Sequence, residues 1–77
     1  MSASRNKMQE EELDREKHYD LYYAVFYNEP RDVHYLLKRG ANSDYIIPGK
    51  GESTKQLALR LKESGKLCDE IQKMLNL

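Results

Sequence analysis

The chain has 77 residues, of which 13 are basic and 13 are acidic, so its formal net charge is zero. This length suits one small domain with a thin core, and the balanced charge disfavours nucleic acid and anionic membranes as partners. Charged residues make up 34% and apolar residues 39% of the chain, which favours well-solvated helices over a sheet sandwich.

The cysteine content and the first 18 residues predict the cellular compartment of the protein. Cys68 is the only cysteine, so no disulfide can form within the chain and a reducing compartment is expected. Residues 1–18 contain no apolar run, and we therefore expect neither a secretory signal nor a membrane span there. The cytoplasm or the nucleus is the expected location.

The first segment, residues 1–18, is predicted to be a charged arm. Met8 and Leu13 are its only large apolar residues after Met1, and they form no stripe at helical spacing. Asn6 and Gln9 have the spacing of a helix cap, which leaves two alternatives, a helical arm or a frayed and disordered one. Residues 19–77 are predicted to form the domain.

The next segment predicts a pair of short helices. Apolar residues recur at spacings of three and four before Asn28, and Pro30 then suits the first turn of a second helix. Gly40 follows two cationic residues and predicts the end of that helix. The apolar positions of the pair are Leu21, Ala24, Val25, Val33, Leu36 and Leu37.

A loop over residues 42–52, with a possible extended tip, separates this pair from a second one. Ser53 and Gln56 have the spacing of a capping box, which predicts a helix start, and Gly65 predicts its end. A last helix is expected from about Lys66 onward. The apolar positions of the second pair are Leu57, Ala58, Leu61, Leu67, Ile71, Met74 and Leu75.

The stretch from Tyr19 to Asp44 resembles one ankyrin repeat, whose pattern is T-P-L-H-x-A-A, a turn, V-x-x-L-L and G-A-D/N. It departs from the pattern at Tyr19, Asp20 and Tyr22, and Asn28 stands where the turn glycine is usual, a mild change because asparagine tolerates the left-handed backbone. The matching positions are Leu21, Ala24, Val33, Leu36, Leu37, Gly40, Ala41 and Asn42.

A weaker second copy begins at Gly51, and Ala58 follows Ala24 by 34 positions. Ile71 follows Val33 by 38 positions, so the second unit carries an insertion, as terminal repeats often do. The matching positions are Leu57, Ala58, Ile71, Met74 and Leu75. The resemblance covers about residues 19–76 and implies an all-α fold of stacked helix-turn-helix pairs.

Repeat arrays generally need three or more units, because each helix pair has an apolar face that it cannot cover alone. About two units are present here. We therefore expect the N-terminal arm, a second copy of the chain or a partner protein to cover an open face.

The aromatic residues are concentrated in one part of the chain. All six tyrosines and the single phenylalanine lie between positions 19 and 45. The resemblance implies partner binding through the first helix and the loop tip, and large rigid rings are common at interface hot spots. Tyr22 and Tyr35 are instead expected in the core, because they adjoin Leu21 and Leu36. The expected partner-binding residues are Tyr23, Phe26, Tyr27 and Tyr45.

No residues predict catalysis, a cofactor or a metal. His18, His34 and Cys68 lack the spacing of metal ligands, and no nucleophile can be placed with a base. The sequence from Pro48 to Gly51 resembles a phosphate loop only superficially, since no serine or threonine follows its Gly-Lys pair.

The expected function is therefore that of a protein-protein interaction module, an adaptor or regulatory binder, and not that of an enzyme. Two alternatives stay open, a homo-oligomeric building block and a small inhibitor that occludes a partner enzyme or a nucleic-acid complex through its acidic arm. Another protein is the expected partner, with no membrane involved and nucleic acid disfavoured.

Overall fold

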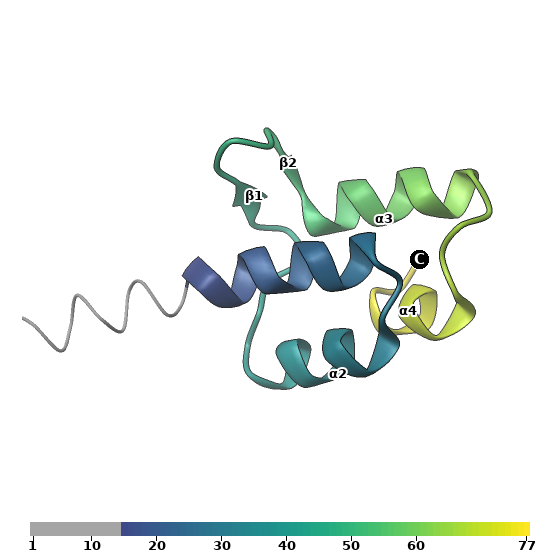
Figure 1. The fold of residues 1–77 in the computed structure, drawn as a ribbon, viewed down its shortest axis with the longest axis horizontal. Helices are drawn as coiled ribbons and strands as arrows, with labels where there is room; N and C mark the ends of the chain where they lie inside the picture. The colour runs from purple at the N-terminus through teal and green to yellow at the C-terminus, as the bar shows by residue number, and fades with distance from the viewer. Residues whose placement is uncertain (1–14) are drawn as a thin grey trace, which may run out of the picture.

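The computed structural model describes residues 15–77 as a mostly helical fold with a small two-stranded sheet (Figure 1). The first element, here called the N-terminal helix, is described from residue 15 to residue 26. It is followed by α2 (Pro30–Lys38), β1 (Ile46–Ile47), β2 (Glu52–Ser53), α3 (Thr54–Glu63) and α4 (Asp69–Met74).

The N-terminal helix is continuous across residue 18, where the sequence predicted that the arm ends. Residues 15–18 are helical, and the backbone N–H of Asn42 donates to Nδ1 of His18 at 3.0 Å. Nζ of Lys17 donates to the carbonyl of Arg39 at 3.4 Å. The predicted boundary after residue 18 is therefore not an end of this element, and residues 1–14 lie outside the described part of the chain.

The turns within the first helix pair have the predicted left-handed residues. Asn28 has a φ of 59° and Gly40 a φ of 92°, while Pro30 is the first residue of α2. Asn28 also makes a long-range contact, because its Oδ1 accepts the backbone N–H of Cys68 at 2.9 Å. This bond joins the turn of the first pair to the start of α4.

The loop over residues 42–52 ends in a β-hairpin. β1 and β2 pair antiparallel, with Ile46 opposite Ser53 and Ile47 opposite Glu52. The Tyr19 hydroxyl donates to the carbonyl of Pro48 at 2.9 Å, and Ile47 is fully buried. The hairpin is therefore attached to the N-terminal helix at its tip and at its first strand.

The predicted capping box of α3 is confirmed. Ser53 accepts the backbone N–H of Gln56 through its hydroxyl, and the Gln56 side chain accepts the backbone N–H of Ser53 at 2.8 Å. The predicted start of the last helix at Lys66 is wrong, because Cys68 has extended backbone angles and α4 begins at Asp69. Leu67 is nevertheless buried, so it packs from the connecting turn.

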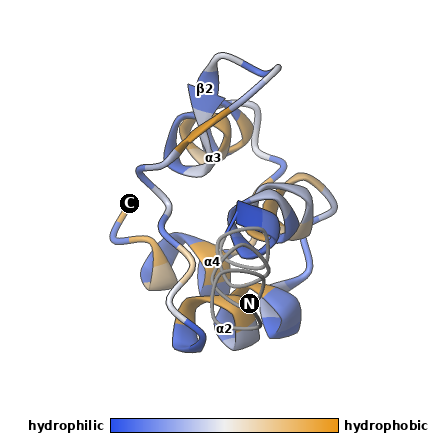
Figure 2. Ribbon diagram, turned by 90° about the vertical axis from the view of Figure 1, so that its left-hand side faces the viewer, coloured by the Kyte–Doolittle hydropathy of each residue, from blue (hydrophilic) through white to orange (hydrophobic). Residues whose placement is uncertain are grey.

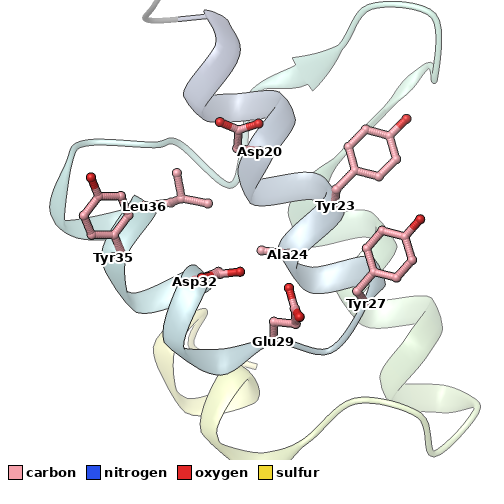
Figure 3. A pocket seen from close by; sticks show the side chains of 8 residues that line it. All are labelled: Asp20, Tyr23, Ala24, Tyr27, Glu29, Asp32, Tyr35 and Leu36. Atoms are coloured by element: carbon pink, nitrogen blue, oxygen red, sulfur yellow. The ribbon is translucent and has the colours of Figure 1, made fainter.

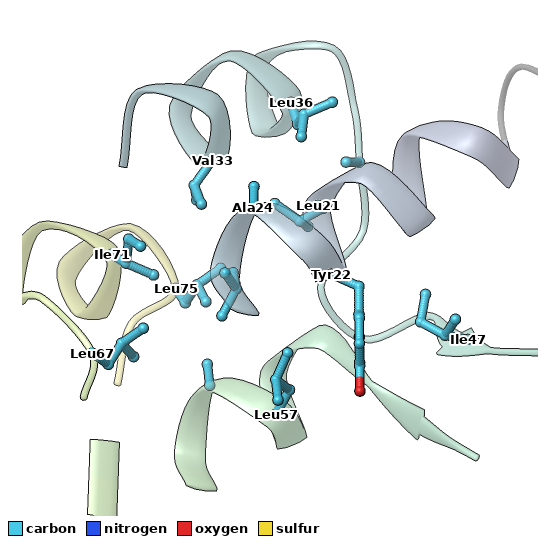
Figure 4. Packing of buried hydrophobic residues seen from close by; sticks show 13 residues of the cluster. Leu21, Tyr22, Ala24, Val33, Leu36, Ile47, Leu57, Leu67, Ile71 and Leu75 are labelled. Atoms are coloured by element: carbon cyan, nitrogen blue, oxygen red, sulfur yellow. The ribbon is translucent and has the colours of Figure 1, made fainter. Parts of the chain in front are cut away.

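Side chains from the four described helices and from β1 meet in one core. Figure 4 shows them pointing into a common interior, and α2 and α4 are in contact. Figure 2 shows hydrophobic residues along the sides of the helices that face one another, with hydrophilic residues outside. Each such large side chain contributes about 1.5–3 kcal/mol on burial.

The positions that the sequence assigned to the core are mostly buried. The fully or nearly fully buried ones are Leu21, Ala24, Val25, Val33, Leu36, Leu57, Ala58, Leu67, Ile71 and Leu75, whereas Leu37, Leu61 and Met74 are partly buried against them.

Candidate functional site

Three aromatic side chains are exposed on one side of the N-terminal helix. Tyr23, Phe26 and Tyr27 are 39%, 50% and 67% exposed, and their spacing of three and four residues places them on one face. Phe26 stacks on Tyr27 with ring centroids 5.1 Å apart, and Tyr23 stacks on Tyr27 at 6.4 Å. We call these three residues the aromatic patch.

The opposite side of the same helix explains why the patch faces outward. Leu21, Ala24 and Val25 are buried in the core, so the helix is held in one rotational setting. The three residues of the aromatic patch lie on the side away from those core positions and therefore point toward solvent. Substitutions in the patch should for this reason change binding more than folding.

The other tyrosines are buried or exposed in a pattern that differs in part from the prediction. Tyr45, expected to bind a partner with the patch, is half-buried and stacks on His18 at 4.3 Å between ring centroids, so its ring packs within the chain. Tyr22 is buried as expected. Tyr35 is 58% exposed, and its prediction as a core residue is wrong because α2 presents Val33 and Leu36 to the core, which turns Tyr35 away.

A groove lies beside the patch, between the N-terminal helix and α2 (Figure 3). Its volume is about 320 Å³. Figure 3 shows Tyr23 and Tyr27 along one side, Tyr35 on the other, and Ala24 and Leu36 between them. The lining residues are Asp20, Tyr23, Ala24, Tyr27, Glu29, Asp32, Tyr35 and Leu36.

The charged residues of the groove are all acidic. Asp20 comes from the N-terminal helix, while Glu29 and Asp32 come from the turn and from α2. None of the three forms an ion pair with a residue between 15 and 77. The hydrogen bond with Asp32, and the repulsion between the two carboxylates, raise the pKa of Glu29 above its usual value.

This raised pKa leads to a prediction for Glu29→Gln. The contact with Asp32 stabilises the fold while Glu29 is protonated, and that stability is lost as the pH rises through the raised pKa. Glutamine keeps the uncharged form at every pH. We therefore expect the variant to melt at a higher temperature than the natural chain at pH 7, with a smaller difference at pH 3.

The measurement is thermal unfolding by circular dichroism at the two pH values. Glu63→Gln is the matched control, because Glu63 is an exposed glutamate on α3 outside the groove. A lower melting temperature for Glu29→Gln at pH 7 would contradict the repulsion.

A second polar cluster attaches the hairpin to the N-terminal helix. The Tyr22 hydroxyl donates to Oε2 of Glu52 at 2.8 Å, and Arg60 of α3 pairs with the same oxygen. Burial, and then the bond to Glu52, raise the pKa of Tyr22, whereas the bonds from Tyr22 and Arg60 lower the pKa of Glu52. Lys50 lies over the rings of Tyr22 and Tyr23, 5.9 and 5.5 Å from their centroids. These contacts position the hairpin beside the patch.

The described residues also bear on metal binding and membrane insertion. Residues 15–77 contain no group of three or more histidine, cysteine, aspartate or glutamate side chains that could hold a metal ion. Within that same range, every helix is too short or too polar to cross a bilayer. Cys68 is a half-buried thiol.

Comparisons with protein-family models, with curated proteins and with solved structures find no match. The resemblance to ankyrin repeats is therefore supported only by the residue pattern of this chain. Sequence reasoning identified the aromatic patch but missed the groove acids Asp20, Glu29 and Asp32. Their spacing could have indicated them, since residues three apart on a helix lie close together: Asp20 precedes Tyr23 by three positions, and Glu29 precedes Asp32 by three.

Proposed function

We propose that this chain is a protein-binding module of the adaptor or regulatory kind, which contacts another polypeptide through the aromatic patch. One observation carries the proposal: Tyr23, Phe26 and Tyr27 are exposed together at the end of the N-terminal helix, with Tyr27 as the first residue after it. Rings of this kind supply large contact areas at a low cost in conformational entropy, and they are enriched at interface hot spots.

The surroundings of the patch support the same function. The patch borders a groove, so that a partner could contact the rings and also insert a side chain between two helices. The helix that carries the patch is anchored by its buried side and by the hydrogen bonds of Tyr19 and Tyr22 to the hairpin loop. A surface on a rigid element binds with less loss of entropy than a surface on a mobile loop.

We propose further that the fold is a short ankyrin-like array of two helix pairs. Two features support this, the left-handed residues Asn28 and Gly40 at the turns and the buried residues at most of the repeat positions. In such an array each pair covers the apolar face of the next. The cytoplasm or the nucleus is the proposed location, in keeping with a lone thiol at Cys68. A catalytic role is not proposed.

The test is quantitative affinity capture with the full chain and two variants, followed by identification of bound proteins by mass spectrometry. Phe26→Ser removes the central ring of the patch, and Leu59→Ser is the matched control because Leu59 is a 43% exposed apolar residue on α3. We expect a partner whose recovery falls at least about fivefold with Phe26→Ser and stays unchanged with Leu59→Ser, since a hot-spot ring contributes about 1–3 kcal/mol.

Circular dichroism must show that both variants keep their helices. Partners lost equally from both variants, or from neither, would contradict the proposal. Sedimentation of the isolated chain separates the alternative of a homo-oligomer, for which Phe26→Ser would convert a concentration-dependent assembly into a monomer.

A further inference from the structure

We propose that the groove between the N-terminal helix and α2 binds an arginine side chain presented by the partner polypeptide. This inference deepens the proposed function, on which it rests, by naming the chemistry of the partner. Three properties of the groove point to an arginine side chain: its charge, its aromatic walls and its shape.

The groove carries negative charge that the described chain does not neutralise. Asp20, Glu29 and Asp32 line it, no basic residue does so, and none of the three acids is ion-paired within residues 15–77. The carboxylates of Glu29 and Asp32 lie next to each other in the groove (Figure 3), and two ionised carboxylates so placed repel one another. A cation placed between them would remove that repulsion, so the charge of the groove is complementary to a basic group.

The aromatic walls select a cation that can stack. Tyr23 and Tyr27 lie along one side of the groove and Tyr35 on the other (Figure 3). Two of these rings already interact with cations of the chain, because Lys50 lies 5.5 Å from the Tyr23 centroid and Arg39 lies 5.3 Å from that of Tyr35. Tyrosine rings of these walls thus already take part in cation-π contacts, and the three acids lie with Ala24 and Leu36 between the walls (Figure 3).

Arginine meets both requirements in one side chain. Its planar guanidinium stacks on aromatic rings and donates paired hydrogen bonds to carboxylates, which the compact ammonium of lysine cannot do together. Its aliphatic stem would lie over Ala24 and Leu36 between the walls. A bare metal ion fits less well, since no three potential ligands converge among residues 15–77.

The shape of the groove indicates a side chain of a larger partner. At about 320 Å³ the space is at the lower end for a ligand site, and it is an open hollow at the edge of the aromatic patch. A partner that covers the patch would exclude water from the groove and strengthen every contact of the guanidinium. The patch and the groove would then act as one surface.

The test uses nuclear magnetic resonance of the full, isotope-labelled chain titrated with N-acetyl-arginine methylamide at 0.15 M salt. The same compound with citrulline in place of arginine is the control ligand, because it has nearly the same shape without the charge. We expect saturable shifts of the amides of Asp20, Tyr23, Glu29, Asp32 and Tyr35, with a dissociation constant of about 1–10 mM, typical of one exposed side chain. Citrulline should cause little change.

Variants then assign the site. Asp32→Asn should weaken arginine binding about fivefold, and Asp20→Asn tests the other helix if the first variant alters α2. Asp44→Asn is the matched control, since Asp44 is an exposed aspartate in the loop outside the groove. Absent binding, equal binding of citrulline, or equal weakening by Asp44→Asn would overturn the inference.

The two proposals can fail separately. Phe26 belongs to the patch but not to the groove, and Asp32 belongs to the groove but not to the patch. If a captured partner is lost with Phe26→Ser but kept with Asp32→Asn, the binding function stands and the arginine inference is wrong. If arginine binds the groove but no partner depends on Phe26, the proposed function is wrong.

Discussion

Replacing Leu21 with alanine should lower the free energy of unfolding by about 3 kcal/mol, within the range observed for leucine truncation in cores. Leu21 is fully buried in the cluster formed by all the described helices. The remaining cavity cannot collapse easily, because the helix is also held by its hydrogen bonds to the hairpin loop. The expected fall in melting temperature is about 10–25 °C for a domain of this size.

Leu59→Ala is the control for this prediction, since Leu59 is 43% exposed on α3. Both variants remove the same atoms from a helical leucine, so the difference between them reports burial. Urea unfolding followed by circular dichroism gives both free energies. An effect of Leu59→Ala as large as that of Leu21→Ala would show that the core is not where the structure places it.

Replacing Thr54 with valine should raise the free energy of unfolding by about 1 kcal/mol, an effect of the opposite sign. Thr54 is fully buried at the start of α3, and its hydroxyl has no hydrogen-bond partner among residues 15–77. Valine has nearly the same shape and carries no polar group that loses its bonds to water on folding. The neighbouring capping contacts of Ser53 do not use the Thr54 side chain.

Thr54→Ser is the matched variant for this second prediction. It keeps the hydroxyl and removes the buried methyl group, so it should destabilise the fold where valine stabilises it. Urea unfolding of the two variants tests the difference in sign. A valine variant less stable than the natural chain would mean that the hydroxyl makes a contact on which the fold depends.

The proposed binding surface combines two kinds of residue on one scaffold. The patch supplies apolar area through Phe26 and Tyr27, whereas the groove supplies charge through Glu29 and Asp32. Area and charge act differently in recognition, because buried rings give affinity while complementary charges select among partners. Formal charge is zero over the whole chain, so the negative charge of the groove is a local feature.

Local sequence rules predicted the elements and turns of the fold well. The capping box at Ser53 and Gln56, the left-handed Asn28 and the left-handed Gly40 just beyond α2 each depend on neighbouring residues in the chain. Such features are set by backbone sterics and short-range hydrogen bonds, which are the same in any tertiary context. The apolar spacing likewise identified the core positions, because one face of each helix must be buried.

Only the tertiary structure decided how the tyrosines and acids are used. Tyr22, Tyr35 and Tyr45 each adjoin an aliphatic residue in the sequence, yet one is buried, one is exposed and one stacks on His18. The backbone N–H of Cys68, directly before α4, bonds to Asn28, which lies 40 positions earlier in the sequence. The groove also requires two helices to be placed together before Asp20 and Asp32 can line the same space. Helical periodicity determines which side of a helix is apolar, whereas the packing angle between helices determines which polar residues meet.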